Sequence, residues 1–455
     1  MIRYFVQRIG IIIPTMLLVV WLTFLLKNAV PGDYTESMLA LQGISSEQEA
    51  IRKEAYIKTY TELHQHLPLF YFSILPGHYP DNVRSVKDPE KRSDFKVLLR
   101  LGFHHSDILK CLDNKNIVIN CLLSADVDFN ERKTISSLLV KFPSNISVVF
   151  NKNITINNNA LALAWKKFSK SVASMQAKNK IGILPRFCWY GSENQFHLYI
   201  KQIVGGDFGI SMKDGKPVLT KLSGAFKWTA VLVFFSLFFA LLISIPAGLL
   251  SGNKEKGASG LLIRGLTMFF YSFPVFWLAT LAITFFANSQ MLPWLQIFPT
   301  PGNWYIAEQN FWQIFSQYIY QLILPVICLA IHDAALLTNM IRVSTITERS
   351  KTYTKAAFAK GLNTSQVLYR HILPNVSIQI ISLLAGIVPS ALAGSLVIEL
   401  MFNIPGMGRL MVNSIYSQDW NVVFGALMVF TIITMSFNLL ADLAYSFLNP
   451  KIKLA

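Results

Sequence analysis

The sequence predicts an all-α polytopic membrane protein of six transmembrane helices, with a large α+β extracytoplasmic domain inserted between helices 1 and 2. Of 455 residues, 53% are hydrophobic and only 15% are charged, whereas roughly 25% are charged in an ordinary soluble domain. Six apolar runs are long enough to cross ~30 Å of hydrocarbon. They span residues 9–26, 229–250, 266–287, 314–341, 378–401 and 422–448.

Three regions follow from this distribution. Residues 1–30 are the first transmembrane helix, 31–225 an extracytoplasmic domain with an interfacial segment at 218–226, and 226–455 a five-helix core with a cytoplasmic loop at about 342–375. Periodicity and turn residues predict the elements of the inserted domain. These are helices at 45–65, with a capping box from Ser45 or Ser46 to Glu49, and at 161–177, and strands at 96–101, 117–123 and 146–150.

Three of the four cysteines, Cys111, Cys121 and Cys188, lie in the inserted domain. Outside the cytoplasm, a Cys111–Cys121 disulfide is one arrangement and three buried thiols are the other. The sequence leaves both open. Cysteines and histidines show no paired spacing typical of a metal site, so we predict no metal ligands.

The distribution of cations predicts the orientation in the membrane. If helix 1 runs outward, the cytoplasmic segments hold thirteen Lys and Arg residues, and the two short outer loops hold only Arg409. The thirteen are Arg3, Arg8, Lys254, Lys256, Arg264, Arg342, Arg349, Lys351, Lys355, Lys360, Arg370, Lys451 and Lys453. Cations favour the cytoplasmic side, so both termini are predicted to be cytoplasmic. The net charge of +16 is spread along membrane flanks, which argues against nucleic-acid binding.

A basic, polar segment, residues 352–375, lies between two of the apolar runs. Lys355-Ala356-Ala357 favours a helix, and Gly361 supplies the left-handed position that often follows a helix end. A second short helix, capped from Asn363–Ser365, is predicted to end at Leu373-Pro374. Two short helices at an angle would project into the cytoplasm, where they suit docking into a cleft of another protein.

This spacing resembles the cytoplasmic signature of ABC importer permeases. Ala356-Ala357 is followed after three residues by Gly361, and Leu373-Pro374 stands twelve positions beyond it. Lys355 occupies the place of the signature's Glu, and the longer run from Tyr353 to Gly361 is similar to the dipeptide, oligopeptide and nickel branch. Three other segments resemble that branch in the same order: Pro31-Gly32-Asp33, Gly206–Ser211 and Pro405–Arg409.

The resemblance implies a permease subunit of an ATP-driven importer of peptides or a similar small solute, in a bacterial inner membrane. It implies two ABC ATPase subunits, a second homologous permease and an extracytoplasmic solute-binding protein as partners. The chain itself is expected to be no enzyme and to bind no cofactor, because ATP and magnesium belong to the ATPase subunits. Its own stretch Gly209–Pro217 has one residue too many for a Walker A loop, so we predict a turn.

Ionisable residues inside apolar spans are costly and therefore mark candidate pathway residues. We expect Glu399, His332 and Asp333 to line the translocation pathway. Glu399 either meets the amino group of a peptide at the outer mouth or pairs with Arg409 to fix the following turn. For Asp333, the alternative is a hydrogen bond to a neighbouring helix.

Two other functions were weighed. In an ion-coupled secondary transporter, these three residues would relay protons, but the inverted repeats with interrupted helices that such transporters show are not visible in the sequence. In a membrane-anchored sensor or interaction protein, the external domain would be the working part. That hypothesis leaves the pattern of residues 352–375 unexplained.

Overall fold

The computed structural model describes residues 2–44, 49–123, 127–149, 156–177, 184–255, 257–288, 293–302 and 311–448. The chain forms two compact units, Met1–Val30 with Gly206–Ala455, and Pro31–Gly205. We call them the membrane unit and the inserted unit. The sequence analysis grouped residues 206–225 with the inserted domain, but their contacts place them in the membrane unit.

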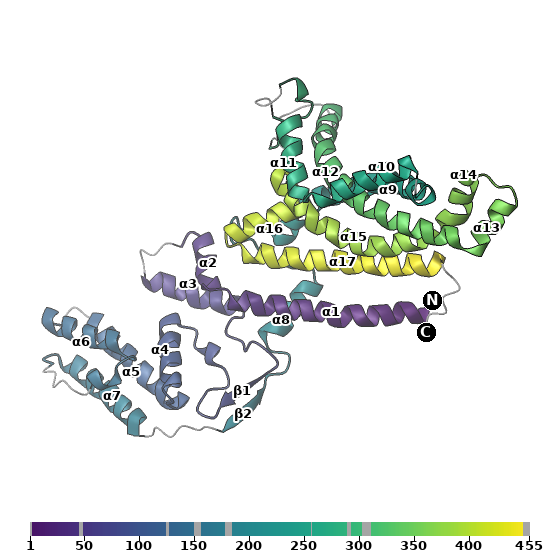
Figure 1. Ribbon diagram of the computed structural model, residues 1–455. Helices are drawn as coiled ribbons and strands as arrows, with labels where there is room; N and C mark the ends of the chain where they lie inside the picture. Colours follow the sequence, from purple (N-terminus) through teal and green to yellow (C-terminus); the bar gives the residue numbers. More distant parts are fainter. Residues whose placement is uncertain are drawn as a thin grey trace. The chain divides into compact units, whose positions relative to one another are not determined.

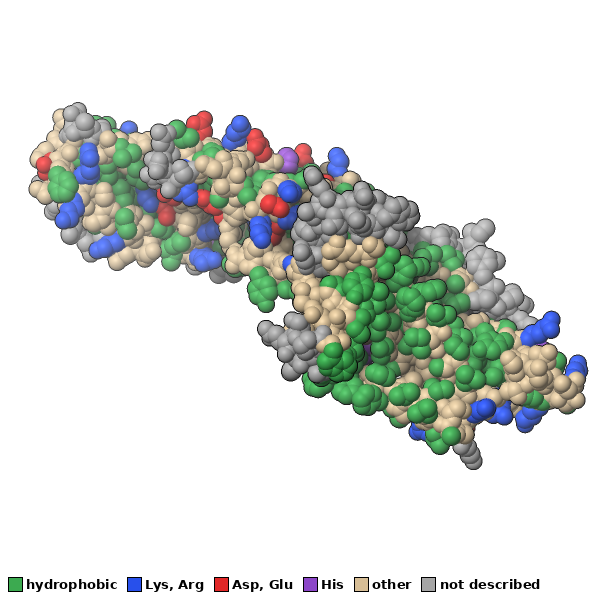
Figure 2. All heavy atoms as spheres, turned by 90° about the horizontal axis from the view of Figure 1, so that it is seen from above, with side chains coloured by type: hydrophobic (Ala, Val, Ile, Leu, Met, Phe, Trp, Pro, Cys, Tyr) green, Lys and Arg blue, Asp and Glu red, His purple; other side chains and the backbone are tan. Residues whose placement is uncertain are grey.

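The membrane unit is built from long apolar helices (Figure 1). These are α1 (Ile2–Ala29), α9 (Val218–Asn253), α12 (Phe311–Ser350), α15 (Leu373–Met401) and α17 (Trp420–Leu448). Among the described residues, five helices are long and apolar enough to cross a membrane, or six if one bent pair forms a single span. Hydrophobic side chains cover much of this unit in Figure 2, as a surface in contact with lipid requires.

The third predicted span, 266–287, is not one helix. Helix α10 (Ala258–Ser272) and helix α11 (Val275–Phe286) meet at 95°. Pro274 has no N–H to donate, and Phe273 before it adopts the extended conformation that precedes a proline most easily. The prediction of one continuous helix at 266–287 was therefore wrong.

The interfacial helix predicted at 218–226 is also absent as a separate element, because these residues form the first turns of α9. Val218 and Leu222 are buried against α16 (Met407–Tyr416) and α17. Gly425 makes room for them, since a Cβ at that position would lie 2.9 Å from Val218 Cγ1. The apolar face of this segment is thus covered by protein.

The most extensive helix pairing of the membrane unit joins α9 to α12. A Cβ atom added at Gly248 would lie 2.6 Å from Ile341 Cβ, and one at Gly252 would lie 2.6 Å from Thr345 Cβ. The two glycines are four residues apart on one face of α9. They form the small-xxx-small pattern that lets membrane helices pack with their backbones close together.

The inserted unit is mainly helical. Its elements are α2 (Tyr34–Leu41), α3 (Glu49–Glu62), β1 (Phe72–Pro76), η1 (Val83–Ser85), α4 (Pro89–Arg100), α5 (His105–Leu123), α6 (Phe129–Lys141), η2 (Ile146–Val149), α7 (Asn159–Ala177), β2 (Pro185–Trp189) and α8 (Gln195–Val204). Helices α4 to α7 enclose an apolar core that includes Phe95, Ile135 and Phe168. Strands β1 and β2 pair antiparallel, with Phe72 opposite Trp189.

The strands predicted in this unit were misplaced. Residues 96–100 lie in α4, 117–123 in α5 and 146–149 in the 3₁₀ turn η2. Each predicted run is short, and a short apolar run does not distinguish a strand from one helix face. In α4, for example, Phe95, Leu98 and Leu99 are the buried residues, at helical spacing.

Both helices predicted in the inserted unit are present. The helix predicted at 161–177 is α7, and the one predicted at 45–65 is α3. The capping residues Ser45 and Ser46 lie outside the described residues.

The cysteines of the inserted unit form no disulfide. Cys111 and Cys121 lie on the same helix, α5, and ten residues of α-helix rise about 15 Å. A disulfide needs Cα atoms within roughly 4.4–6.8 Å. The structure thus decides the alternative that the sequence left open, with Cys111 and Cys188 as buried thiols.

The close approach of α9 and α12 predicts the effect of a larger residue at Gly248. Gly248→Leu should destabilise the membrane unit by about 1–3 kcal/mol, because overpacking forces the helices apart. Gly265→Leu is the matched control, since a Cβ at Gly265 meets no atom within 4 Å. Thermal unfolding of the purified chains measures the difference, and equal midpoints for the two variants would contradict the packing argument.

Candidate functional site

The segment 352–375 forms the two short helices that its sequence predicts (Figure 1). Helix α13 (Thr352–Ala359) ends before Gly361, which has a φ of +83°. Asn363 caps α14 (Thr364–Val367). Its side chain accepts a hydrogen bond from the N–H of Gln366, and the Gln366 side chain accepts one from the N–H of Asn363.

The second helix does not end at Pro374, as the sequence suggested. Helix α14 continues through a π-helical turn, η4 (Leu368–Ile372), directly into α15. Pro374 is the second residue of α15.

An apolar core attaches the segment to the membrane helices. Ala357, Val367 and Ile372 pack in one cluster with Leu249 of α9 and Ile341 of α12. Most of these side chains are fully buried. The two short helices are therefore a rigid extension of the helix bundle.

A buried carboxylate at the end of α12 adds a polar attachment. Glu348 is 5% exposed and accepts hydrogen bonds from Lys351 Nζ at 2.6 Å and from the Tyr353 hydroxyl at 2.5 Å. Its backbone carbonyl accepts one from the Thr354 hydroxyl at 2.8 Å. These bonds fix the corner between α12 and α13. The sequence analysis missed Glu348, although it is the only acid between Asp333 and Glu399.

The residues predicted to form the coupling loop divide into two groups. Lys355, Ala356 and Gly361 are exposed, as is Pro374, so they form an outer surface. Ala357 is buried and Leu373 half-buried, because they face the core.

Glu399, at the other end of α15, is fully enclosed. The Thr229 hydroxyl donates to its Oε1 at 2.7 Å, and the backbone N–H of Arg409 donates to its Oε2 at 3.1 Å. Thr229 Oγ1 in turn accepts from the N–H of Met407 at 2.9 Å. Helix α16 starts at this point. Its first N–H groups have no partner within the helix, so a carboxylate there is favourable.

Of the two alternatives that the sequence offered for Glu399, the contact with Arg409 at the following turn is present, but it is made by the backbone of Arg409 and is not an ion pair. The Arg409 guanidinium donates to the carbonyl of Asn403 at 2.6 Å, and only the backbone of Arg409 reaches Glu399. The carboxylate has no exposed surface with which to meet a peptide. A Cβ at Gly406 would lie 2.3 Å from Glu399 Cδ, so glycine is needed for this close approach.

His332 and Asp333 lie together on α12. The imidazole of His332 stacks on Tyr271, with ring centroids 6.0 Å apart, and its Nδ1 has no hydrogen-bond partner among the described residues. Asp333 is 5% exposed, and its Oδ2 has no hydrogen-bond partner among the described residues. Glu399 is bonded to Thr229, Ser395 and the backbone of Arg409, and not to His332 or Asp333.

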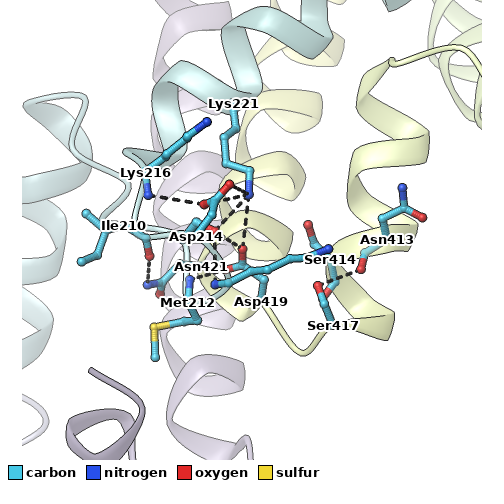
Figure 3. A network of polar contacts seen from close by, with 12 residues as sticks. Ile210, Met212, Asp214, Lys216, Lys221, Asn413, Ser414, Ser417, Asp419 and Asn421 are labelled. Carbon is cyan, nitrogen blue, oxygen red and sulfur yellow. Dashed lines mark hydrogen bonds and ion pairs between the residues drawn. The ribbon is translucent and has the colours of Figure 1, made fainter. Parts of the chain in front are cut away.

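A further polar network joins the start of α9 to the turn between α16 and α17 (Figure 3). Asp419, 1% exposed, accepts hydrogen bonds from the Ser211 hydroxyl at 2.5 Å and from the Met212 N–H at 2.9 Å. Lys221 Nζ lies 3.7 Å from the Asp419 carboxylate and 3.1 Å from that of Asp214. The network fixes the turn that precedes α9.

The turn predicted at Gly209–Pro217 is present. The N–H of Ser211 bonds the carbonyl of Lys216, and Gly215 has a φ of +67°. Asp419 was missed by the sequence analysis, although it is the only acid between residues 402 and 421.

Residues 244–454 match the model of the family described as binding-protein-dependent transport system inner membrane component. The oligopeptide transport system permease protein AppB of Bacillus subtilis is 32% identical over 269 residues, which are 58% of this chain and 83% of that protein. The chain belongs to this permease family.

Two further relatives are of the same type. The dipeptide transport system permease protein DppB of Haemophilus influenzae is 29% identical over 267 residues, covering 56% of this chain and 79% of that protein. The glutathione transport system permease protein GsiC of Escherichia coli is 31% identical over 260 residues, covering 57% and 79%. The chain is an ABC importer permease of the peptide type.

Membership of the family decides between the functions weighed from the sequence. The protein is a multi-pass permease subunit of the inner membrane. The family is a membrane component of transport systems and not itself an enzyme. In the described part of this permease, no group of three or more His, Cys, Asp or Glu residues could hold a metal ion.

The enclosed carboxylate of the permease gives a test at Gly406. Gly406→Ala should displace Glu399 from Thr229 and Arg409 and cost about 2 kcal/mol or more of stability, because hydrogen bonds to a buried charge are lost. Gly386→Ala, on the same helix as Glu399, is the control, since a Cβ there meets nothing within 4 Å. We expect a lower thermal unfolding midpoint for Gly406→Ala alone. Two variants as stable as the wild type would show that the turn does not depend on the carboxylate.

Proposed function

We propose that this permease forms half of the translocation pathway of an ATP-driven importer for peptides or a similar small solute. The names of its relatives support the substrate class, since dipeptides, oligopeptides and the tripeptide glutathione are all peptides. The observation that carries the proposal is the segment 352–375, which holds a small exposed surface on a rigid base.

This exposed surface is the proposed contact with an ABC ATPase subunit. Ala356 and Gly361 are small, so the backbone of α13 can lie close to the wall of a cleft, in the manner of a helix in a groove. Lys355 would lie at the edge of the contact. The complete importer would contain two ATPase subunits, a second homologous permease and an extracytoplasmic solute-binding protein. ATP and magnesium would bind to the ATPase subunits, and this chain would bind no cofactor.

The attachments of the segment supply a route for the movement. Closure of the ATPase pair would shift α13, and the bonds of Glu348 and the core around Ile341 would pass the shift to α12 and α9. Transport then follows from the different affinity of nucleotide for the inward-facing and outward-facing states.

We place His332 and Asp333 in the translocation pathway. A buried carboxyl group in a membrane span is costly, and Asp333 has an oxygen without a partner in the described residues. Water or a polar part of the solute would supply that partner. The enclosure of Glu399 supports a different role for this residue, as the anchor of the outer turn beside the pathway.

The proposed orientation has both termini in the cytoplasm and the inserted unit outside it. The thirteen cationic residues on one side support it. Of these, Arg3, Arg8, Lys256, Lys451 and Lys453 lie outside the residues whose side chains are described. Lys and Arg side chains are visible at the end of the membrane unit where α13 and α14 lie (Figure 2).

Co-purification tests the proposal. A tagged wild-type chain, solubilised gently, should retain an ATPase subunit and a second permease. Ala356→Glu should retain at least about tenfold less ATPase, because it places a charge at the centre of the contact. Gly361→Val should also lower retention, since a β-branched residue at a positive φ strains the backbone by about 1–3 kcal/mol.

Ala258→Glu is the matched control, because Ala258 is an exposed alanine at the start of α10 where an acid is compatible with the helix. It should bind ATPase as the wild type does. Ala357 is unsuitable for this test, since it is buried. If the Ala356→Glu variant retains the ATPase fully and takes up peptide as the wild type does, the proposed docking role is wrong.

A further inference from the structure

Four cations gather in the inserted unit around α4. Arg92, Lys96 and Arg100 are spaced by four residues along this helix, and Arg84 lies in η1 just before it. They are close enough that Arg92, Arg84 and Arg100 each help to lower the pKa of Lys96, after partial burial. This cluster of Arg84, Arg92, Lys96 and Arg100 is called the cationic cluster below.

Two stacked tyrosines hold the cluster in place. The rings of Tyr56 and Tyr60 on α3 are 5.9 Å apart and nearly parallel. The guanidinium of Arg92 lies 4.2 Å from the centroid of Tyr60 and donates to the Tyr56 hydroxyl at 2.8 Å. The Tyr56 hydroxyl donates to Asp33 at 2.5 Å, and that of Tyr60 to the carbonyl of Arg84 at 3.2 Å. These contacts with the two tyrosines thus fix the positions of Arg92 and η1.

The charge of the cationic cluster is poorly compensated. Five other cations of the inserted unit form ion pairs. They are Arg52 with Glu36, Lys53 with Asp88, Lys91 with Asp113, Lys115 with Asp94, and Arg186 with Asp81. No member of the cluster forms an ion pair with a described residue.

Three members of the cluster have free donors. Within the described part of the chain, the side chains of Arg84, Lys96 and Arg100 donate no hydrogen bond, and the last two are exposed. Burial and the neighbouring Arg92 lower the pKa of Arg84. An anion placed here would relieve the mutual repulsion and accept the free N–H groups. Guanidinium forks beside an ammonium group match the several oxygens of a phosphate better than a single carboxylate.

We propose that Arg84, Arg92, Lys96 and Arg100 form a binding site for a phosphate group. Both ends of the inserted unit, at Pro31 and Gly205, continue in the sequence into the membrane unit, so the headgroup of an anionic phospholipid is one source of that phosphate to be tested. Free phosphate shares the chemistry and is the second source to be tested. The proposal does not depend on the substrate of the permease.

The test uses the full-length chain in nanodiscs of phosphatidylcholine, with phosphatidylglycerol added in increasing amounts. Native mass spectrometry counts the phosphatidylglycerol molecules retained on the protein. The variant R84Q/K96Q/R100Q should bind this lipid at least about tenfold more weakly than the wild type. The control K166Q/K167Q/K170Q removes the same charge from exposed positions of α7 and should bind like the wild type.

Inorganic phosphate, titrated calorimetrically into the protein in pure phosphatidylcholine, separates the two sources. Loss of phosphatidylglycerol in the cluster variant, with no heat from phosphate, assigns the site to lipid. If the control still releases heat with phosphate and the cluster variant does not, while both retain the same number of phosphatidylglycerol molecules, the site is assigned to free phosphate. If the cluster variant and the control bind phosphatidylglycerol equally and also bind phosphate equally, the cationic cluster is not a phosphate site. If circular dichroism shows that the triple variant is unfolded, K96Q/R100Q replaces it, with an expected weakening of about threefold.

Discussion

Backbone groups that leave the helical pattern inside the membrane unit need a protein partner, because lipid offers none. Two side chains meet this need at two breaks. Glu399 accepts from the first turn of α16, and Asp419 accepts from the turn before α9. These two buried carboxyl groups therefore lie where helices of the membrane unit stop.

The same constraint separates two kinds of ionisable group in the membrane unit. Glu399 and Asp419 have several donors each, so their buried oxygens are satisfied by the turns that they touch. Asp333 has an oxygen without a partner in the described residues. A group of this kind is expensive unless the protein uses it, and this difference in hydrogen bonding makes Asp333 the better candidate for the pathway.

The segment 352–375 combines a fixed base with an open surface. Its buried side chains belong to the core that contains α9 and α12, and Glu348 ties its first helix to the end of α12. A loop that swung freely would absorb the movement of a partner. In the proposed importer, a loop that is packed and hydrogen-bonded in this way would transmit the movement of the ATPase, because packed interiors deform little.

The inserted unit is stabilised differently from the membrane unit. It has an apolar core of its own and pairs many of its cations with acids at the surface. The cationic cluster departs from that pattern, although the tyrosines beneath it are tightly organised. Positions held in place without a compensating charge point to a ligand more than to stability, since like charges repel at this range.

The sequence by itself determined the membrane class, the permease pattern of residues 352–375 and the helices α3 and α7. These features depend on local composition, helix capping and spacing along one chain. Only the tertiary structure decided that 96–100 and 117–123 are helical, because a short apolar run takes its form from the surface against which it packs. It also brought Glu399 together with its donors Thr229 and Arg409, which come from two other elements. The groups that donate hydrogen bonds to a buried carboxyl group are distant from it in the sequence. Spacing along the chain therefore does not predict them.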